Sequence, residues 1–147
     1  MSDDQVFFED VAVGQEIPVL TKSVNTVNIN MYCAVVWLMD RIHFDHPFAV
    51  ERRGLPNIVA PGNMACDYYV QLLNDWIGDL GVLKKVAVQF RSFMLPGNTL
   101  TCGGRVTDVA ANGDSGTVEL ELWIKNEDGV TCVPGTARVE LPSRATQ

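Results

Sequence analysis

The segment DRIHFDHPFA holds the residue types that proton transfer requires. It contains Asp40, His43, Asp45 and His46 within one predicted loop. A neutral imidazole near pH 7 can accept a proton from water, and a carboxylate beside it can take or return one. The segment is therefore a candidate acid–base site, although a loop histidine can also serve only to hydrogen-bond the backbone.

A candidate group for stabilising negative charge follows in the turn IVAPGNM. Gly62 stands at the start of a predicted helix, where a bare backbone N–H can approach a ligand oxygen and the helix dipole adds positive partial charge. The alternative for Gly62 is a glycine needed only for the geometry of the turn. Asn63 supplies either a side-chain donor or an ordinary helix cap.

Asp67 is a carboxylate on an otherwise apolar helix. A partly buried carboxylate has a raised pKa and can act as a base. We favour the other interpretation, in which Asp67 faces solvent or an interface.

Hydrophobic periodicity and turn residues predict the elements that position these groups. A short strand at Val19–Val24 precedes a helix at about Val27–Leu38, which Asn25 or Thr26 can cap. After the loop that holds His43 comes a short helical piece at Phe48–Arg53.

The second half of the chain combines one long helix with strands. The helix spans Asn63–Ile77, and a hairpin turn is predicted at Asp128-Gly129. The tail Ser143–Gln147 is expected to be disordered. The predicted strands are Val82–Met94, Thr99–Val109, Thr117–Asn126 and Thr131–Leu141.

The long helix carries apolar residues round most of its circumference, which is typical of a buried helix. One helix is buried on nearly every face only when a sheet curls round it. We therefore predict an α+β protein with the hot-dog fold, in which an antiparallel sheet wraps around one long central helix. No linker, repeat or low-complexity stretch divides the sequence, so we expect a single domain over residues 1–147.

The composition limits the classes of function. The chain is 47% hydrophobic and 20% charged, with a formal net charge of −7. It lacks the basic face that nucleic acid requires, and its apolar runs are too short to cross a membrane. The cysteines are widely separated, with no C-x-x-C and no histidine at metal-ligand spacing. We therefore expect a soluble, cytoplasmic protein with reduced thiols, no metal and no cofactor.

Five segments together resemble the MaoC-like (R)-specific enoyl-CoA hydratases and dehydratases. FEDVAVGQEI is similar to the N-terminal signature of that family, DRIHFDHPFA to the loop with its catalytic histidine, and NIVAPGNM to its glycine turn. VQFRSFMLPGNTLTCGGRVTDV and VELELWIKNEDGVTCVPGTARVELP are similar to its strands. The resemblance extends over nearly the whole chain and is specific as a set.

The resemblance implies an activity and partners. The family has a hot-dog fold that forms dimers, or pseudo-dimers of two unlike domains, and binds acyl-CoA or acyl carrier protein thioesters in a tunnel at the dimer interface. It adds water to a trans-2-enoyl thioester or removes water from a (3R)-hydroxyacyl thioester. A homodimer is therefore expected, or a heteromer with another MaoC-like chain.

The resemblance also assigns roles to residues. His43 matches the catalytic histidine, but the aspartate five residues earlier in the usual D-x-N-P-x-H pattern is Leu38 here. Asp40 is the nearest carboxylate, so we predict Asp40 and His43 as the catalytic pair. Gly62, with Asn63, is the predicted oxyanion and substrate-binding group, because the family uses backbone amides of its glycine turn there.

Three functions stay open from the sequence. The first is the hydratase or dehydratase reaction by the Asp/His pair. The second is a non-catalytic partner chain of a heteromeric MaoC-like hydratase for bulky, steroid-type acyl-CoA, because Leu38 replaces the aspartate and VQLLNDWIG is similar to that branch. The third is a hot-dog acyl-CoA thioesterase in which Asp67 activates water.

Overall fold

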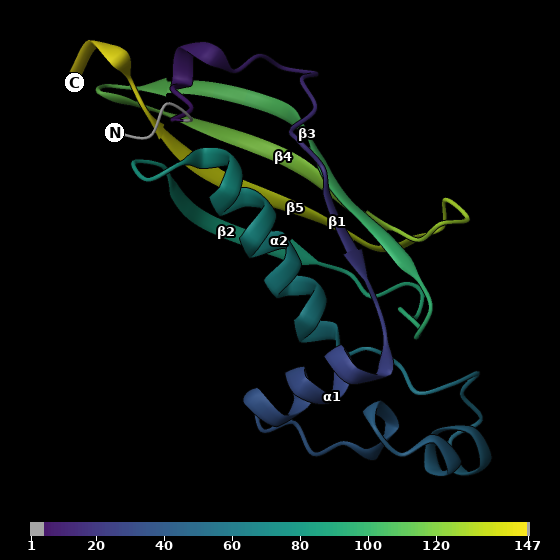
Figure 1. Cartoon of the computed structure of the whole chain (residues 1–147). Coiled ribbons are helices and arrows are strands. Elements are labelled where there is room, and N and C mark those ends of the chain that lie inside the picture. Colours follow the sequence, from purple (N-terminus) through teal and green to yellow (C-terminus); the bar gives the residue numbers. More distant parts are fainter. Residues whose placement is uncertain (1–4, 147) are drawn as a thin grey trace.

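The computed structural model describes residues 5–146 of the chain. Five antiparallel strands form one sheet in the order β1-β3-β4-β5-β2. The sheet curls, and one long helix, α2 (Gly62–Ile77), lies along its concave face (Figure 1). This is the predicted α+β hot-dog arrangement. The strands are β1 (Leu20–Ser23), β2 (Val82–Val88), β3 (Thr99–Asn112), β4 (Ser115–Lys125) and β5 (Thr131–Pro142).

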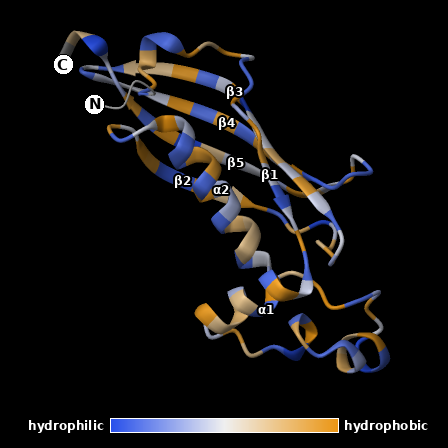
Figure 2. Ribbon diagram, viewed as in Figure 1, coloured by the Kyte–Doolittle hydropathy of each residue, from blue (hydrophilic) through white to orange (hydrophobic). Residues whose placement is uncertain are grey.

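The core lies between α2 and the concave face of the sheet. In β4, Val118, Leu120 and Leu122 are buried while Glu121 is exposed, as the alternation in the sequence predicts. Figure 2 shows the same alternation of hydrophobic and hydrophilic residues along the strands. Burying each large aliphatic side chain contributes about 1.5–3 kcal/mol, so this face of the sheet holds the helix in place.

The sheet covers only one side of α2, so the expectation of a helix buried on nearly every face is wrong for the single chain. Tyr69 and Leu73 are fully buried, but Asp67, Gln71 and Asn74 on the opposite side are exposed. The exposed side is open to a neighbour or to solvent. None of the helices within residues 5–146 combines the length and the apolar character needed to cross a bilayer.

The first helix, α1 (Thr26–Val35), begins where the sequence predicts and ends earlier. Asn25 caps it, since its side chain accepts a hydrogen bond from the Asn28 amide at 2.8 Å. The helix was expected to run to Leu38, but Trp37 has a φ of 56° and the Leu38 amide donates to the Cys33 carbonyl at 2.9 Å. This is the Schellman arrangement that ends helices.

Strand β2 ends at Val88, so the predicted continuation to Met94 is wrong. The next residue, Gln89, donates its amide to the Pro134 carbonyl at 2.9 Å. Proline has no N–H to return the bond, so the regular ladder is interrupted, although the Arg91 amide still donates to the Cys132 carbonyl at 2.9 Å. The residues that follow, 89–98, form an irregular segment against the start of α2.

The predicted disorder of the C-terminal tail is wrong for residues 143–146. Arg144–Thr146 form a short 3-10 turn, η4. Arg144 pairs with Asp10 at 2.8 Å, and the Ser143 hydroxyl donates to Glu9. Gln147 lies outside the described residues.

We expect Trp37→Gly to stabilise the protein. Trp37 holds a left-handed backbone conformation that costs an L-residue about 1–2 kcal/mol, and its indole is 80% exposed. Glycine removes that cost, so the free energy of unfolding in a denaturant titration should rise by about 1 kcal/mol. Trp37→Ala keeps the Cβ and should bring no comparable gain. Equal stabilities for the glycine and alanine variants would contradict this explanation.

Candidate active site

A pocket of about 380 Å³ lies at the N-terminus of α2. Three segments and one residue of β5 line it. The 3-10 turn η2 (Arg41–His43) and the chain leading into it contribute Leu38, Ile42 and His43, and residues 59–63 lead into α2. The rest of the lining is Phe90, Ser92, Phe93 and Met94 after β2, and Val133. Its lining is largely apolar, with His43, Asn63 and Ser92 as the polar side chains. A pocket of this size and character is typical of a small-molecule site.

His43 is the titratable group in this lining. Its side chain is buried, and Nδ1 lies 2.7 Å from the Val59 carbonyl oxygen. A carbonyl only accepts hydrogen bonds, so Nδ1 carries the proton in the neutral ring and Nε2 is left as the basic nitrogen. The backbone thus sets the tautomer that a general base needs.

Gly62 belongs to the first turn of α2, where intrahelical hydrogen bonds leave the amides without acceptors. Pro61 is the N-cap and its side chain caps nothing. Gly62 and Asn63 therefore present amides and positive partial charge at the pocket that His43 also lines. The structure brings together three of the four predicted site residues: His43, Gly62 and Asn63.

The fourth predicted residue, Asp40, lies apart from them. Asp40 is exposed and caps η2, with its carboxylate accepting a hydrogen bond from the Ile42 amide at 3.2 Å. From this loop, the pocket is lined by Leu38, Ile42 and His43. The turn at Trp37 produces this arrangement, because it reverses the chain directly before Leu38.

Asp45 holds the loop together. Its carboxylate accepts hydrogen bonds from the Arg41 guanidinium at 2.7 and 2.9 Å and from the Phe48 amide at 3.1 Å. The bond from Arg41, and after it the bond from the Phe48 amide, lowers the pKa of Asp45. A carboxylate held ionised in this way suits a structural role better than proton donation. Phe48 begins a π-helical turn, η3 (Phe48–Arg52).

Asp67 lies on the exposed side of α2, away from the His43 pocket. It accepts a hydrogen bond from the Tyr32 hydroxyl at 2.6 Å and lines a separate groove of about 340 Å³ between α1 and α2. Burial, and then the hydrogen bond to Asp67, raises the pKa of Tyr32. Asp67 is exposed, as we favoured from the sequence.

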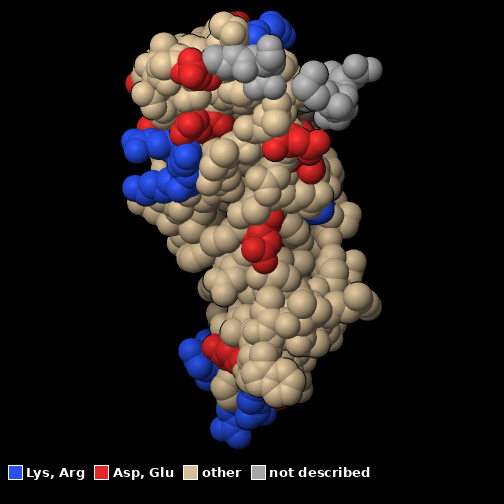
Figure 3. Space-filling model, turned by 90° about the vertical axis from the view of Figure 1, so that its left-hand side faces the viewer, with Lys and Arg blue, Asp and Glu red and all other residues tan. Residues whose placement is uncertain are grey.

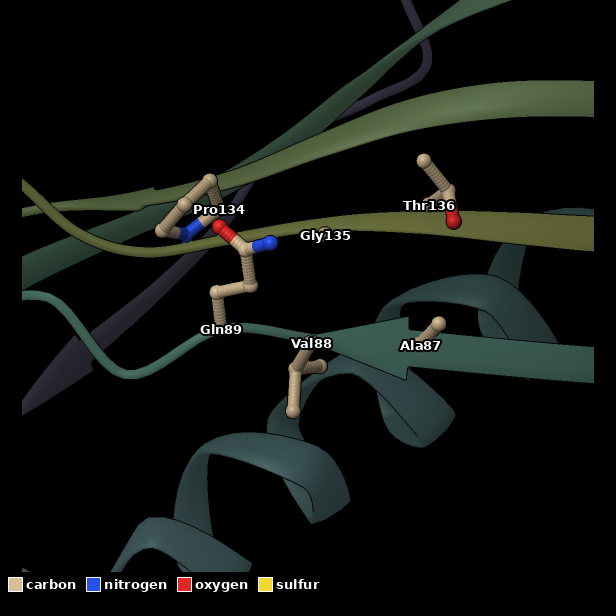
Figure 4. A pocket seen from close by; sticks show the side chains of 6 residues that line it. All are labelled: Ala87, Val88, Gln89, Pro134, Gly135 and Thr136. Carbon is tan, nitrogen blue, oxygen red and sulfur yellow. The ribbon is translucent and has the colours of Figure 1, made fainter.

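Another hollow, of about 290 Å³, lies where β2 ends against β5 (Figure 4). Six residues line it, and none of them has a titratable side chain. They include Gln89, Pro134 and Thr136. It can therefore hold a ligand group but cannot transfer protons. Of these two hollows, the one lined by His43 is the one with a side chain that can transfer a proton.

Part of the pocket wall lies in the segment after β2, which was not predicted as part of the site. Phe90, Ser92 and Phe93 line the pocket, although the run VQFRSF reads as a continuing strand. The available signal was Pro134 in the partner strand, because a proline opposite Gln89 cannot donate a hydrogen bond and so interrupts the regular ladder.

Comparisons with known proteins give matches in structure alone. No family model matches the sequence, and no curated protein matches it significantly. The R-hydratase PhaJ1 from Pseudomonas aeruginosa, in its unliganded form, is 17% identical with a TM-score of 0.82. The match covers 95% of this chain and 88% of that one.

Two further solved structures match over most of both chains. A MaoC-like dehydratase from Rhodospirillum rubrum is 19% identical with a TM-score of 0.82, over 95% of this chain and 98% of that one. A chain of the ChsH1-ChsH2 complex from Mycobacterium tuberculosis is 18% identical with a TM-score of 0.77, over 88% and 98%. The chain therefore has the hot-dog fold, in the form that MaoC-like dehydratases and R-hydratases have.

Proposed function

We propose that this protein adds water to a trans-2-enoyl thioester, or removes it from a 3-hydroxyacyl thioester. The observation that carries the proposal is the shared pocket of His43 and Gly62, in which a base with a defined tautomer and a helix N-terminal amide line one cavity. The hydratases and dehydratases of the same fold support this class of reaction. The carrier of the acyl group would be CoA or acyl carrier protein.

The residues divide the reaction between them. His43 Nε2 takes a proton from water, and the hydroxyl adds to C3 while the C2=C3 electron pair moves toward the thioester carbonyl. The Gly62 amide donates to the oxygen on which negative charge develops. The imidazolium returns the proton to C2, so the elements of water are added across the double bond. Asn63 lines the same pocket and would hold the water or the thioester oxygen.

We expect His43→Asn to abolish hydration without unfolding the protein. The asparagine amide can still donate to the Val59 carbonyl, but the basic Nε2 is gone. Loss of a general base lowers kcat/KM by roughly 10²–10⁴-fold, measured as the change in enoyl-CoA absorbance. Circular dichroism and thermal melting serve as the control for folding. Activity near that of the wild type would exclude His43 as the base.

Asp40 was predicted from the sequence to be the partner in proton transfer, and its position at the start of η2 supports a different role. We infer that it positions His43 through the bond to the Ile42 amide. Asparagine is an equally good cap and alanine is not.

Asp40→Asn should therefore keep kcat/KM within about threefold of the wild-type value, with an unchanged pH profile. Asp40→Ala should lower kcat/KM further, because alanine cannot cap η2. The measurement is kcat/KM for an enoyl-CoA between pH 5 and 9. A loss of roughly a hundredfold in the asparagine variant would instead support proton transfer by Asp40.

A second candidate function is a silent partner chain in a heteromeric hydratase. Leu38 lines the pocket at the position where the MaoC-like pattern has its aspartate, and a match to a chain of the ChsH1-ChsH2 complex adds support. On the face in Figure 3, surface without charged side chains extends from below a central acidic group to near the lower end. Such a surface, with β2 at the sheet edge, suits pairing with a second hot-dog chain.

The two functions predict different behaviour of the isolated protein. We expect the chain alone to form a homodimer in light scattering and to hydrate enoyl-CoA. A silent partner would be inactive alone, would gain activity only with a second MaoC-like chain, and in that complex would tolerate His43→Asn. That pattern would replace our first proposal with the second.

The thioesterase alternative has less support. Asp67 would have to activate water in a groove separate from the Gly62 amide, and its carboxylate is already bound by Tyr32. Release of free CoA thiol from a saturated acyl-CoA remains the observation that would favour it.

A further inference from the structure

The pocket of His43 and Gly62 adjoins a second hollow across a wall of three residues. This outer hollow has a volume of about 520 Å³ and is lined by residues 90–93 and Leu95. Phe90, Ser92 and Phe93 line both spaces, so they separate the two. Arg91 belongs to the outer hollow alone and gives it a positive charge.

The ring of Phe90 rests against the start of α2. A methyl group built on Gly62 would lie 2.7 Å from Phe90 Cζ and 2.9 Å from Cε1, closer than carbon atoms approach. The edge of the ring therefore occupies the space beside the Gly62 Cα, at the start of α2. With the ring in this position, a side chain at residue 62 would strike it.

The backbone on either side of Phe90 is anchored by hydrogen bonds, whereas its ring is largely exposed. Its neighbours are anchored, since the Gln89 amide donates to the Pro134 carbonyl and the Arg91 amide to the Cys132 carbonyl, both at 2.9 Å. Phe90 is 59% exposed in the single chain, so little packing there resists a change of rotamer. Exposed side chains change rotamer in picoseconds to nanoseconds. The ring can thus swing while the backbone stays in place.

We propose that Phe90 is a gate between the two hollows and sets the size of acyl group that reaches Gly62. The inference rests on the proposed function, because it assigns the inner pocket to the acyl thioester. With the ring swung away, the spaces join into one channel. The acyl group then lies beside His43, and the carrier arm leaves past Arg91, whose guanidinium suits a phosphate of the carrier.

The gate predicts a change of specificity in Phe90→Ala. Removal of the ring enlarges the space beside Gly62, so a long acyl chain gains more than a short one. The ratio of kcat/KM for trans-2-octenoyl-CoA to that for crotonyl-CoA should rise about tenfold, within the range that apolar pockets discriminate. Most of the change should appear in KM. Phe90→Tyr keeps the ring and should return the ratio to that of the wild type.

Phe93→Ala is the matched control for the loss of an aromatic wall residue. Phe93 is exposed to a similar extent and lines both hollows, but the three atoms nearest to a Gly62 side chain all belong to Phe90. Phe93→Ala should therefore change the ratio clearly less. An equal change in both alanine variants, or none in Phe90→Ala, would overturn the gate.

A binding experiment separates failure of the gate from failure of the proposed reaction. The association rate of the saturated octanoyl-CoA is followed by stopped-flow tryptophan fluorescence, which needs no turnover. The gate predicts faster association in Phe90→Ala than in the wild type and in Phe90→Tyr, even if no enoyl-CoA is hydrated. An unchanged rate, or no binding of octanoyl-CoA to the wild type, would overturn it.

Discussion

The candidate site depends on hydrogen bonds that join three loops at Val59 and Ala60. His43 Nδ1 donates to the Val59 carbonyl, and the Val59 amide donates to the Ile42 carbonyl at 3.2 Å. The next residue, Ala60, donates its amide to the Met94 carbonyl at 2.8 Å. These bonds fasten the histidine loop and the segment after β2 to the chain entering α2. Because the residues are buried, breaking one bond would leave a polar group without a partner, at a cost of about 1–3 kcal/mol.

The same bonds explain why a base, an amide and an aromatic wall share one cavity. The helix supplies the fixed part of the site, since Gly62 begins α2 and the buried face of α2 is packed on the sheet. The loops supply the rest of the lining, which includes Leu38, His43 and Phe90. Chemistry on loops held by a rigid scaffold is the usual arrangement in enzymes. In such an arrangement, a substitution in a loop can change substrate specificity without loss of the fold.

The two sides of the candidate pocket differ in chemical character. One side of the pocket has a buried imidazole oriented by the backbone, and the other has the apolar side chain of Leu38. A carboxylate is not needed to orient His43, because the Val59 carbonyl already does so. The proposed reaction would therefore need only one titratable group from this chain, or a partner chain would supply a second one.

The sequence by itself determined the order and type of the elements, the cap at Asn25, the inward residues of β4 and the placement of His43 and Gly62 together. Those features follow from local periodicity, capping chemistry and a resemblance in motif. The tertiary structure decided that Asp40 caps η2 outside the pocket, that α2 has an exposed side, and that residues 90–94 form a wall of the site. Each depends on contacts between residues far apart in the chain, such as Gln89 with Pro134 and Phe90 with Gly62. A pattern along the sequence records the type of a side chain and not the neighbour it meets.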